Sequence, residues 1–141
     1  MTRFGSAAWN GSLREGKGSV STESHALENH PYTFFSRYGE KPGTNPEELL
    51  GAAHAACFTM SFVRQLGQAN FVPENVDSKS GITIEKDGDD FSITSVHLTI
   101  TAKIPGIDHD TFQSIAASAK AGCPVSKLMK VDIHFGATLI S

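Results

Sequence analysis

The chain has 141 residues and a net charge of −3, and 39% of its residues are hydrophobic while 19% are charged. This length supports one domain with its own core, and the composition is that of a folded protein rather than a disordered one. Acidic and basic residues are scattered without a basic stripe, which argues against a nucleic-acid partner. We therefore expect a single domain over residues 1–141.

Two features of the sequence bear on the compartment. Met1–Gly5 contain no apolar run of signal-peptide length, and the apolar stretch Gly51–Phe58 is too short to cross a bilayer. We expect a cytoplasmic protein with no membrane partner. In a reducing compartment its two cysteines are free thiols rather than a structural disulfide, so their reactivity becomes the question.

The first third of the chain is predicted to form a β-meander. Its β-branched and aromatic segments are separated by Gly, Asn and Ser, which favour turns. The expected strands are Ala7–Trp9, Lys17–Thr22 and Tyr32–Tyr38.

A long helix is expected next. Asn45 can cap it, Pro46 suits its first position and Glu48 can close a capping box. From Leu49 to about Leu66 the segment is apolar on nearly all sides, which indicates a buried helix. Because so small a domain has little interior, we expect a second subunit to cover part of this helix through a twofold interface.

The rest of the chain again has strands followed by a helix. Hydrophobic alternation changes phase between Thr94 and Ser95, which predicts a β-bulge. The expected elements are a hairpin of Gly81–Lys86 and Phe91–Ile104, a helix over Asp110–Ala121 stopped by Gly122, a turn over Val125–Met129 and a strand over Val131–Leu139. The fold class is α+β, with sheets wrapped around buried helices.

The two cysteines have different local settings. Cys123 precedes Pro124 in the position of an N-cap, where free N–H groups favour a thiolate, although a small buried residue at a helix junction fits equally well. Cys57 has small apolar neighbours that leave room around sulfur but raise a thiol pKa. A reactive Cys57 therefore needs a cation nearby.

Arg37 is the attractive candidate for that cation, because it ends a predicted strand shortly before the helix. An exposed strand-end arginine is the alternative. Glu47 can orient Arg37, or it can simply serve the helix dipole. Ten residues of continuous helix place Glu47 roughly 15 Å from Cys57. Either the arginine bridges part of this gap, the first turn leaves the helix axis, or Glu47 serves the Cys57 of a partner subunit.

His54 lies three residues before Cys57, on a neighbouring face of the helix. It can act as a general base, but a packed or interface histidine is the favoured interpretation. His54 and Cys57 supply only two potential metal ligands, and zinc requires three or four, so we expect no metal. The sequence contains no dinucleotide fingerprint, phosphate loop or nucleophile elbow, and we expect no cofactor.

Three stretches resemble the OsmC/Ohr family of hydroperoxide peroxidases, and its OsmC branch more than its organic hydroperoxide resistance branch. They are Gly16–Thr22, Gly43–Phe58 and Ala119–Lys127. The resemblance implies an OsmC-like fold of antiparallel sheets around central helices, in an intertwined homodimer with active sites at the interface.

The resemblance also implies a mechanism. Cys57 attacks the hydroperoxide and becomes a sulfenic acid, Cys123 condenses with it to a disulfide, and an external dithiol, of lipoyl type by family, reduces that disulfide. Glu47 and an arginine support Cys57; we assign Arg37, with Arg14 as the reserve because the arginine of the sister branch lies nearer the amino terminus.

Substrate preference and a rival function complete the expectations. Phe34, Phe35, Phe58 and Met60 are expected to line a pocket that favours organic hydroperoxides over hydrogen peroxide. The rival is a non-enzymatic module that senses redox state or binds small apolar ligands. It would be oxidised once or not at all, whereas a peroxidase turns over.

Overall fold

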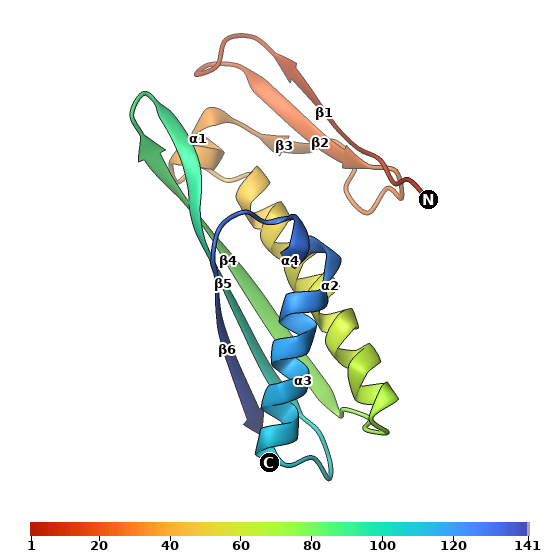
Figure 1. Cartoon of the computed structure of the whole chain (residues 1–141). Helices are drawn as coiled ribbons and strands as arrows, with labels where there is room; N and C mark the ends of the chain where they lie inside the picture. The colour runs from red at the N-terminus through yellow and green to blue at the C-terminus, as the bar shows by residue number, and fades with distance from the viewer. Residues whose placement is uncertain (141) are drawn as a thin grey trace. The chain divides into compact units, whose positions relative to one another are not determined.

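The computed structural model describes residues 1–140, which form two compact units divided between Leu49 and Leu50. The first unit contains β1 (Gly5–Asn10), β2 (Lys17–Thr22), β3 (His30–Tyr32), α1 (Phe34–Tyr38) and the start of α2 (Pro46–Gln68). The second contains the rest of α2, β4 (Asn75–Asp87), β5 (Asp90–Lys103), α3 (His109–Gly122), α4 (Pro124–Leu128) and β6 (Ile133–Ile140). The elements are labelled in Figure 1. The α+β class is confirmed.

The first unit is built on the antiparallel sheet β1-β2-β3. Trp9, Gly18 and Tyr32 occupy matching positions on its three strands. The rings of Trp9 and Tyr32 meet edge to face, with centroids 5.4 Å apart, and a Cβ on Gly18 would lie 2.5 Å from each of them. Gly18 is therefore required so that two aromatic side chains can close over the central strand.

The expected strand over Tyr32–Tyr38 is wrong beyond Tyr32, because the chain turns into α1 there. Thr33 caps this helix: its Oγ1 accepts from the Ser36 N–H at 3.1 Å, and Ser36 Oγ accepts from the Thr33 N–H at 2.8 Å. The rings of Phe34 and Tyr38, one turn apart, pack at a tilt with centroids 5.1 Å apart. A reciprocal cap and an aromatic pair thus outweigh the β-propensity of the segment.

The predicted start of α2 is confirmed. Asn45 Oδ1 accepts from the Glu48 N–H at 2.8 Å, and Pro46 is the first helical residue. The Glu48 carboxylate does not close the expected capping box through the cap backbone. Its Oε1 instead accepts from two side chains, Thr44 Oγ1 at 3.0 Å and Asn45 Nδ2 at 3.2 Å.

The second unit packs helices on one face of the sheet β4-β5-β6 (Figure 1). Thr83 pairs with Ser95 and Ile84 with Ile93, so Thr94 is the extra residue of a bulge, as the phase change predicts. Strand β6 pairs with β5 in parallel, so the expectation of wholly antiparallel sheets is wrong. The chain reaches β6 through α3 and α4, and such a helical crossover brings the next strand back in the same direction.

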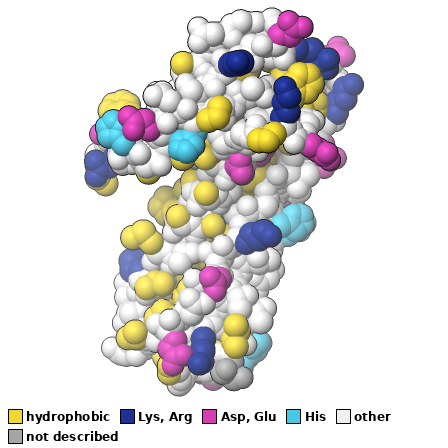
Figure 2. Space-filling model, turned by 180° about the vertical axis from the view of Figure 1, so that it is seen from behind, with side chains coloured by type: hydrophobic (Ala, Val, Ile, Leu, Met, Phe, Trp, Pro, Cys, Tyr) yellow, Lys and Arg dark blue, Asp and Glu magenta, His cyan; other side chains and the backbone are white. Residues whose placement is uncertain are grey.

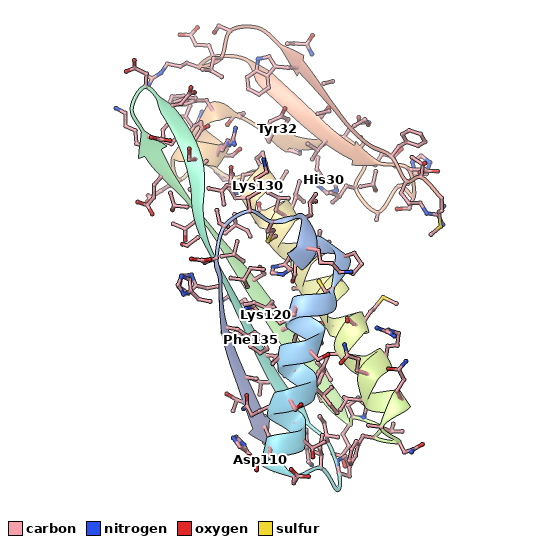
Figure 3. All side chains as sticks on the ribbon, viewed as in Figure 1. His30, Tyr32, Asp110, Lys120, Lys130 and Phe135 are labelled. Carbon is pink, nitrogen blue, oxygen red and sulfur yellow. The ribbon has the colours of Figure 1, made fainter. Side chains whose placement is uncertain are left out.

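The core of the second unit lies between α2, α3 and the sheet. Phe58, Phe62 and Leu66 recur at one-turn spacing on α2 and are fully buried. Phe58 meets the ring of Phe135 at 5.5 Å; Figure 3 labels Phe135 on β6. The other buried members are Leu98, Ile100, Ala102, Ile104, Phe112, Ala116, Ala119 and Cys123.

The opposite side of α2 leaves an apolar face uncovered within the chain. It consists of Ala52, Ala53, Ala56, Met60 and Val63, which are all exposed, Met60 by 77%. The helix is therefore buried on one side within the single chain, and the expected cover of the other side by a second subunit stays a prediction.

Charges are spread over the second unit. In Figure 2, acidic and basic side chains in the lower part of the molecule are interspersed rather than gathered by sign. Among residues 1–140, no helix combines the length and the apolarity that crossing a membrane would need.

Candidate active site

Cys57 lies in the middle of α2, half-buried and unbridged. Burial raises the pKa of its thiol; a hydrogen bond from the Val125 N–H acts in the opposite direction, and donation of the thiol proton to Cys123 raises the pKa further. Within the described residues Cys57 is therefore accessible but weakly acidic.

Cys123 is fully buried where α3 ends and α4 begins, and it is the N-cap of α4 as predicted. Its thiol donates to Ser126 Oγ at 3.3 Å, and its sulfur accepts from the Ser126 N–H at 3.4 Å. Burial alone would raise the pKa of Cys123, but the hydrogen bonds from Ser126, the Cys57 thiol and the Val125 N–H together lower it. Cys123 is thus the more acidic of the two thiols and the less accessible.

The two cysteines, distant in sequence, lie close enough for each to shift the pKa of the other. Both also receive the Val125 N–H, so the first turn of α4 serves both sulfurs. The segments of Cys57 and Cys123 thus meet, while the disulfide expected between them stays a prediction. Since each sulfur is free, the pair has the arrangement from which a disulfide can form between two separate elements.

Arg37 and Glu47 form an ion pair in the first unit. Glu47 Oε1 accepts from Arg37 Nη2 at 2.8 Å and from Nε at 3.1 Å. Glu47 is buried, and its hydrogen bond is the main reason that the pKa of Arg37 is raised. Arg37 lies on α1 rather than at a strand end, which corrects its predicted setting. The interpretation of Glu47 as a partner of Arg37 holds.

Arg14, the reserve candidate, has a different environment. Its guanidinium lies over the ring of Phe34 at 4.8 Å and that of Phe35 at 5.9 Å. Helix α2 is continuous from Pro46, so the alternative in which the first turn leaves the helix axis is excluded.

His54 is fully buried, and both of its ring nitrogens are engaged: Nδ1 lies 2.7 Å from Ser80 Oγ and Nε2 lies 2.9 Å from Ser126 Oγ. Burial lowers its pKa, which favours the neutral ring. The preferred interpretation of a packed histidine is confirmed, yet through Ser126 this ring reaches Cys123. Within residues 1–140, no group of three or more His, Cys, Asp or Glu side chains has an arrangement that could hold a metal ion.

The residues expected to line a substrate pocket are placed differently. Phe58 is fully buried in the core and Met60 is exposed, whereas Phe35 lines a shallow cavity in the first unit with Glu40, Lys41 and Pro42. The second unit has an apolar cavity of about 300 Å³. Its lining comprises Leu50, Ile82, Ile93, Val96, Val125, Leu128, Met129, Lys130 and Val131.

Sequence reasoning missed three groups around the thiols. Ser126 follows Cys123 at the spacing of an N-cap and its N3 partner, so this signal was present. The Val125 N–H follows from the same cap. Ser80 gave no signal, because only the tertiary packing of β4 against α2 brings it to His54.

These contacts define an α+β thiol protein with an accessible cysteine hydrogen-bonded to a buried, more acidic one. The family model for OsmC-like protein matches residues 39–136. The chain belongs to the OsmC-like family.

Two relatives show how far the likeness extends. Peroxiredoxin OsmC of Escherichia coli (strain K12) is 47% identical over 129 residues, which cover 92% of this chain and 90% of that protein. The organic hydroperoxide resistance protein of Xanthomonas axonopodis pv. citri is 33% identical, covering 69% of this chain and 67% of that one. The first likeness, over nearly all of both chains, supports a peroxidase enzyme.

Solved structures agree on the fold. An OsmC-like protein of unknown function from Vibrio cholerae superposes with a TM-score of 0.77 at 12% identity, covering 97% of this chain and 99% of that one. The organic hydroperoxide resistance protein OhrB of Bacillus subtilis gives 0.68 at 20% identity, covering 97% and 98%. The OsmC-like fold is thereby established.

Proposed function

We propose that this protein is a cysteine peroxidase that reduces organic hydroperoxides to alcohols and so protects against oxidative stress. The observation that carries the proposal is the hydrogen bond between Cys57 and Cys123, an accessible thiol and a buried one on separate elements. The peroxiredoxin and hydroperoxide resistance proteins among the relatives support the choice of substrate.

Accessibility assigns the roles of the two cysteines. Cys123 is more acidic but fully buried, so an external peroxide cannot reach its sulfur, whereas Cys57 is partly exposed. Cys57 is therefore the attacking residue and Cys123 the resolving one.

The chemistry divides into two steps. The Cys57 thiolate attacks the distal peroxide oxygen, the O–O bond breaks, and the alkoxide takes up a proton to leave as the alcohol. Cys57 is then a sulfenic acid, and Cys123 displaces its oxygen to form the disulfide and water. An external dithiol, of lipoyl type by family resemblance, restores both thiols by exchange.

Arg37 supplies the positive charge that the first step requires. Burial disfavours the Cys57 thiolate, so a fixed cation must stabilise this thiolate and the departing alkoxide. Two nitrogens of Arg37 donate to one carboxylate oxygen of buried Glu47, whereas the Arg14 guanidinium lies over the ring of Phe34. This contrast favours Arg37 over Arg14.

The apolar cavity of the second unit holds the organic part of the substrate. Val125 lines this cavity while its N–H donates to both cysteine sulfurs, so cavity and thiols share one residue. An alkyl chain gains from leaving water for such a cavity, and hydrogen peroxide has no chain to place there. Organic hydroperoxides are thus preferred.

The working form is a homodimer in the cytoplasm. The apolar face of α2 formed by Ala52, Ala53, Ala56, Met60 and Val63 is the surface that a second copy covers. Cys57 lies beside this face on the helix, so the active site is completed at the interface.

The test is stopped-flow consumption of cumene hydroperoxide by the reduced protein, followed by a count of free thiols. The parent is expected to lose both thiols rapidly, Cys57→Ser to lose neither, and Cys123→Ser to accumulate a sulfenic acid that dimedone traps. With excess dithiol, only the parent turns over repeatedly. Slow oxidation that is indifferent to Cys57→Ser would instead favour the binding-module alternative.

A further inference from the structure

His54 is the exception among the histidines of this chain. Of six histidines it is the buried one, and the other five are exposed. It lies on α2 one turn before Cys57, yet both of its nitrogens face serines of other elements, Ser80 on β4 and Ser126 on α4. Because both nitrogens are hydrogen-bonded, the buried ring is held in one orientation beside the thiol pair.

The hydrogen bonds form one continuous path. With its proton on Nδ1 and donated to Ser80 Oγ at 2.7 Å, the ring has Nε2 free to accept from the Ser126 hydroxyl at 2.9 Å. The oxygen of that hydroxyl accepts in turn from the Cys123 thiol at 3.3 Å. Thiol, hydroxyl and imidazole are thus aligned so that a proton can leave sulfur and arrive on a ring nitrogen.

We propose that His54 is the positioning residue of the second step: through the Ser126 hydroxyl it accepts the Cys123 proton while Cys123 attacks the Cys57 sulfenic acid. The inference rests on the proposed function for the sulfenic acid and on the described contacts for the path. Burial keeps the ring neutral before the step, and a neutral ring is the form that can accept a proton.

The step balances within the protein. The Cys123 sulfur forms the S–S bond to Cys57, and the S–O bond of the sulfenic acid breaks with its electron pair on oxygen. The Cys123 proton passes to Ser126 Oγ as the Ser126 proton passes to His54 Nε2. The departing hydroxide then takes this proton from His54 Nε2 through the Ser126 hydroxyl and leaves as water, which returns the ring to its neutral form. Cys123 is oxidised and Cys57 is reduced from sulfenic acid to disulfide, with no further reagent.

The experiment separates the two steps in reduced protein. The rate of peroxide loss measures attack by Cys57. The ratio of dimedone-trapped sulfenic acid to disulfide measures resolution by Cys123. Ser126→Ala and His54→Gln are expected to leave attack within about twofold and to slow disulfide formation at least tenfold, with more sulfenic acid trapped. Ser126→Thr, which keeps the hydroxyl, is expected to restore resolution.

Ser78→Ala is the matched control. Ser78 lies on the same face of β4 two residues from Ser80, is also half-buried, and bonds Thr59 and the Ala55 carbonyl rather than His54. It should leave both steps unchanged. Unchanged resolution in Ser126→Ala and His54→Gln, or equal slowing of both steps, would overturn the proposal.

A second readout is independent of peroxidase activity. In a Cys57→Ser background, the pH dependence of thiolate absorbance reports the acidity of Cys123 alone. Ser126→Ala removes the hydroxyl 3.3 Å from the Cys123 sulfur and should shift the pKa of Cys123, whereas Ser78→Ala should leave it unchanged. An unchanged Cys123 titration would contradict the path. Failure of the parent to consume hydroperoxide, with the titration shifted as expected, would refute the proposed function and leave the path in place.

Discussion

Cys57 lies inside a long helix, whose backbone N–H groups are used by the helix itself, whereas Cys123 lies directly before a short one, where free N–H groups face its sulfur. The pKa of Cys57 is raised and that of Cys123 is lowered, although the two sulfurs share the Val125 N–H. The comparison shows that acidity and access are divided between the thiols. In the proposed mechanism, the accessible thiol meets the peroxide and the more acidic thiol resolves the sulfenic acid.

The largest expected effect concerns Arg37, the positive charge proposed to offset the raised pKa of Cys57. Arg37→Ala should slow peroxide attack by Cys57 by about a hundredfold, because a fixed donor to the developing alkoxide is lost. The loss of folding stability should be small by comparison. Single-turnover peroxide consumption measures the first quantity and urea unfolding the second. Arg14→Ala is the control, and unchanged attack in Arg37→Ala would end the Arg37 assignment.

A second prediction tests whether a partner subunit affects peroxide attack by Cys57 but leaves the acidity of Cys123 unchanged. Met60→Glu places a charge on the exposed apolar face of α2 and should weaken dimerisation at least tenfold, with slower attack by Cys57. The acidity of Cys123 should not change, since its partners lie in its own chain. Light scattering after gel filtration measures the dimer.

Val72→Glu is the matched control for that change, because Val72 is similarly exposed, at 79%, but follows α2 rather than lying on the face. A Met60→Glu protein that remains dimeric at low micromolar concentration would contradict the assignment of this face.

The third prediction treats the thiols as a coupled pair. Cys123→Ala removes the acceptor of the Cys57 proton, so the pKa of Cys57 should fall and its thiolate fraction at a given pH should rise. Cys57→Ala removes a donor to the Cys123 sulfur, so the pKa of Cys123 should rise. Thiolate absorbance against pH measures both. Shifts of the same sign would mean that the thiols do not interact as described.

The smallest expected effect is on stability. Cys123→Ala removes a buried N-cap and should lower the free energy of unfolding by about 1–2 kcal/mol. Cys57→Ala, at a half-buried position without a cap, should change it by less than about 0.5 kcal/mol. Urea unfolding under reducing conditions compares them, and equal losses would show that the cap adds nothing.

Local chemistry made much of this fold predictable. The Asn45-Pro46 start of α2, the bulge at Thr94 and the cap at Cys123 depend on residues close in sequence, and each is found where expected. Cys57 was identified as a reactive residue only with the help of family resemblance, because its apolar helix by itself predicts an inert thiol.

One local cap and two long-range arrangements explain what sequence reasoning missed. The aromatic run after Tyr32 has β-propensity, and the Thr33–Ser36 cap that turns it into α1 lacks the glutamate of the familiar pattern. The parallel direction of β6 depends on how α3 crosses the sheet. The alternating residues of β6 do not encode that direction. Ser80 reaches His54 only through the packing of β4.

The parallel pairing of β6 with β5 also has a consequence for synthesis on the ribosome. β6 emerges after the other described strands, and its Phe135 packs against Phe58 and the cluster that contains Cys123. A parallel strand cannot join its sheet before the crossover that precedes it has been made. The hydrophobic core of the second unit therefore closes only after residues 133–140 have left the exit tunnel, and the nascent chain carries Cys123 unburied until then.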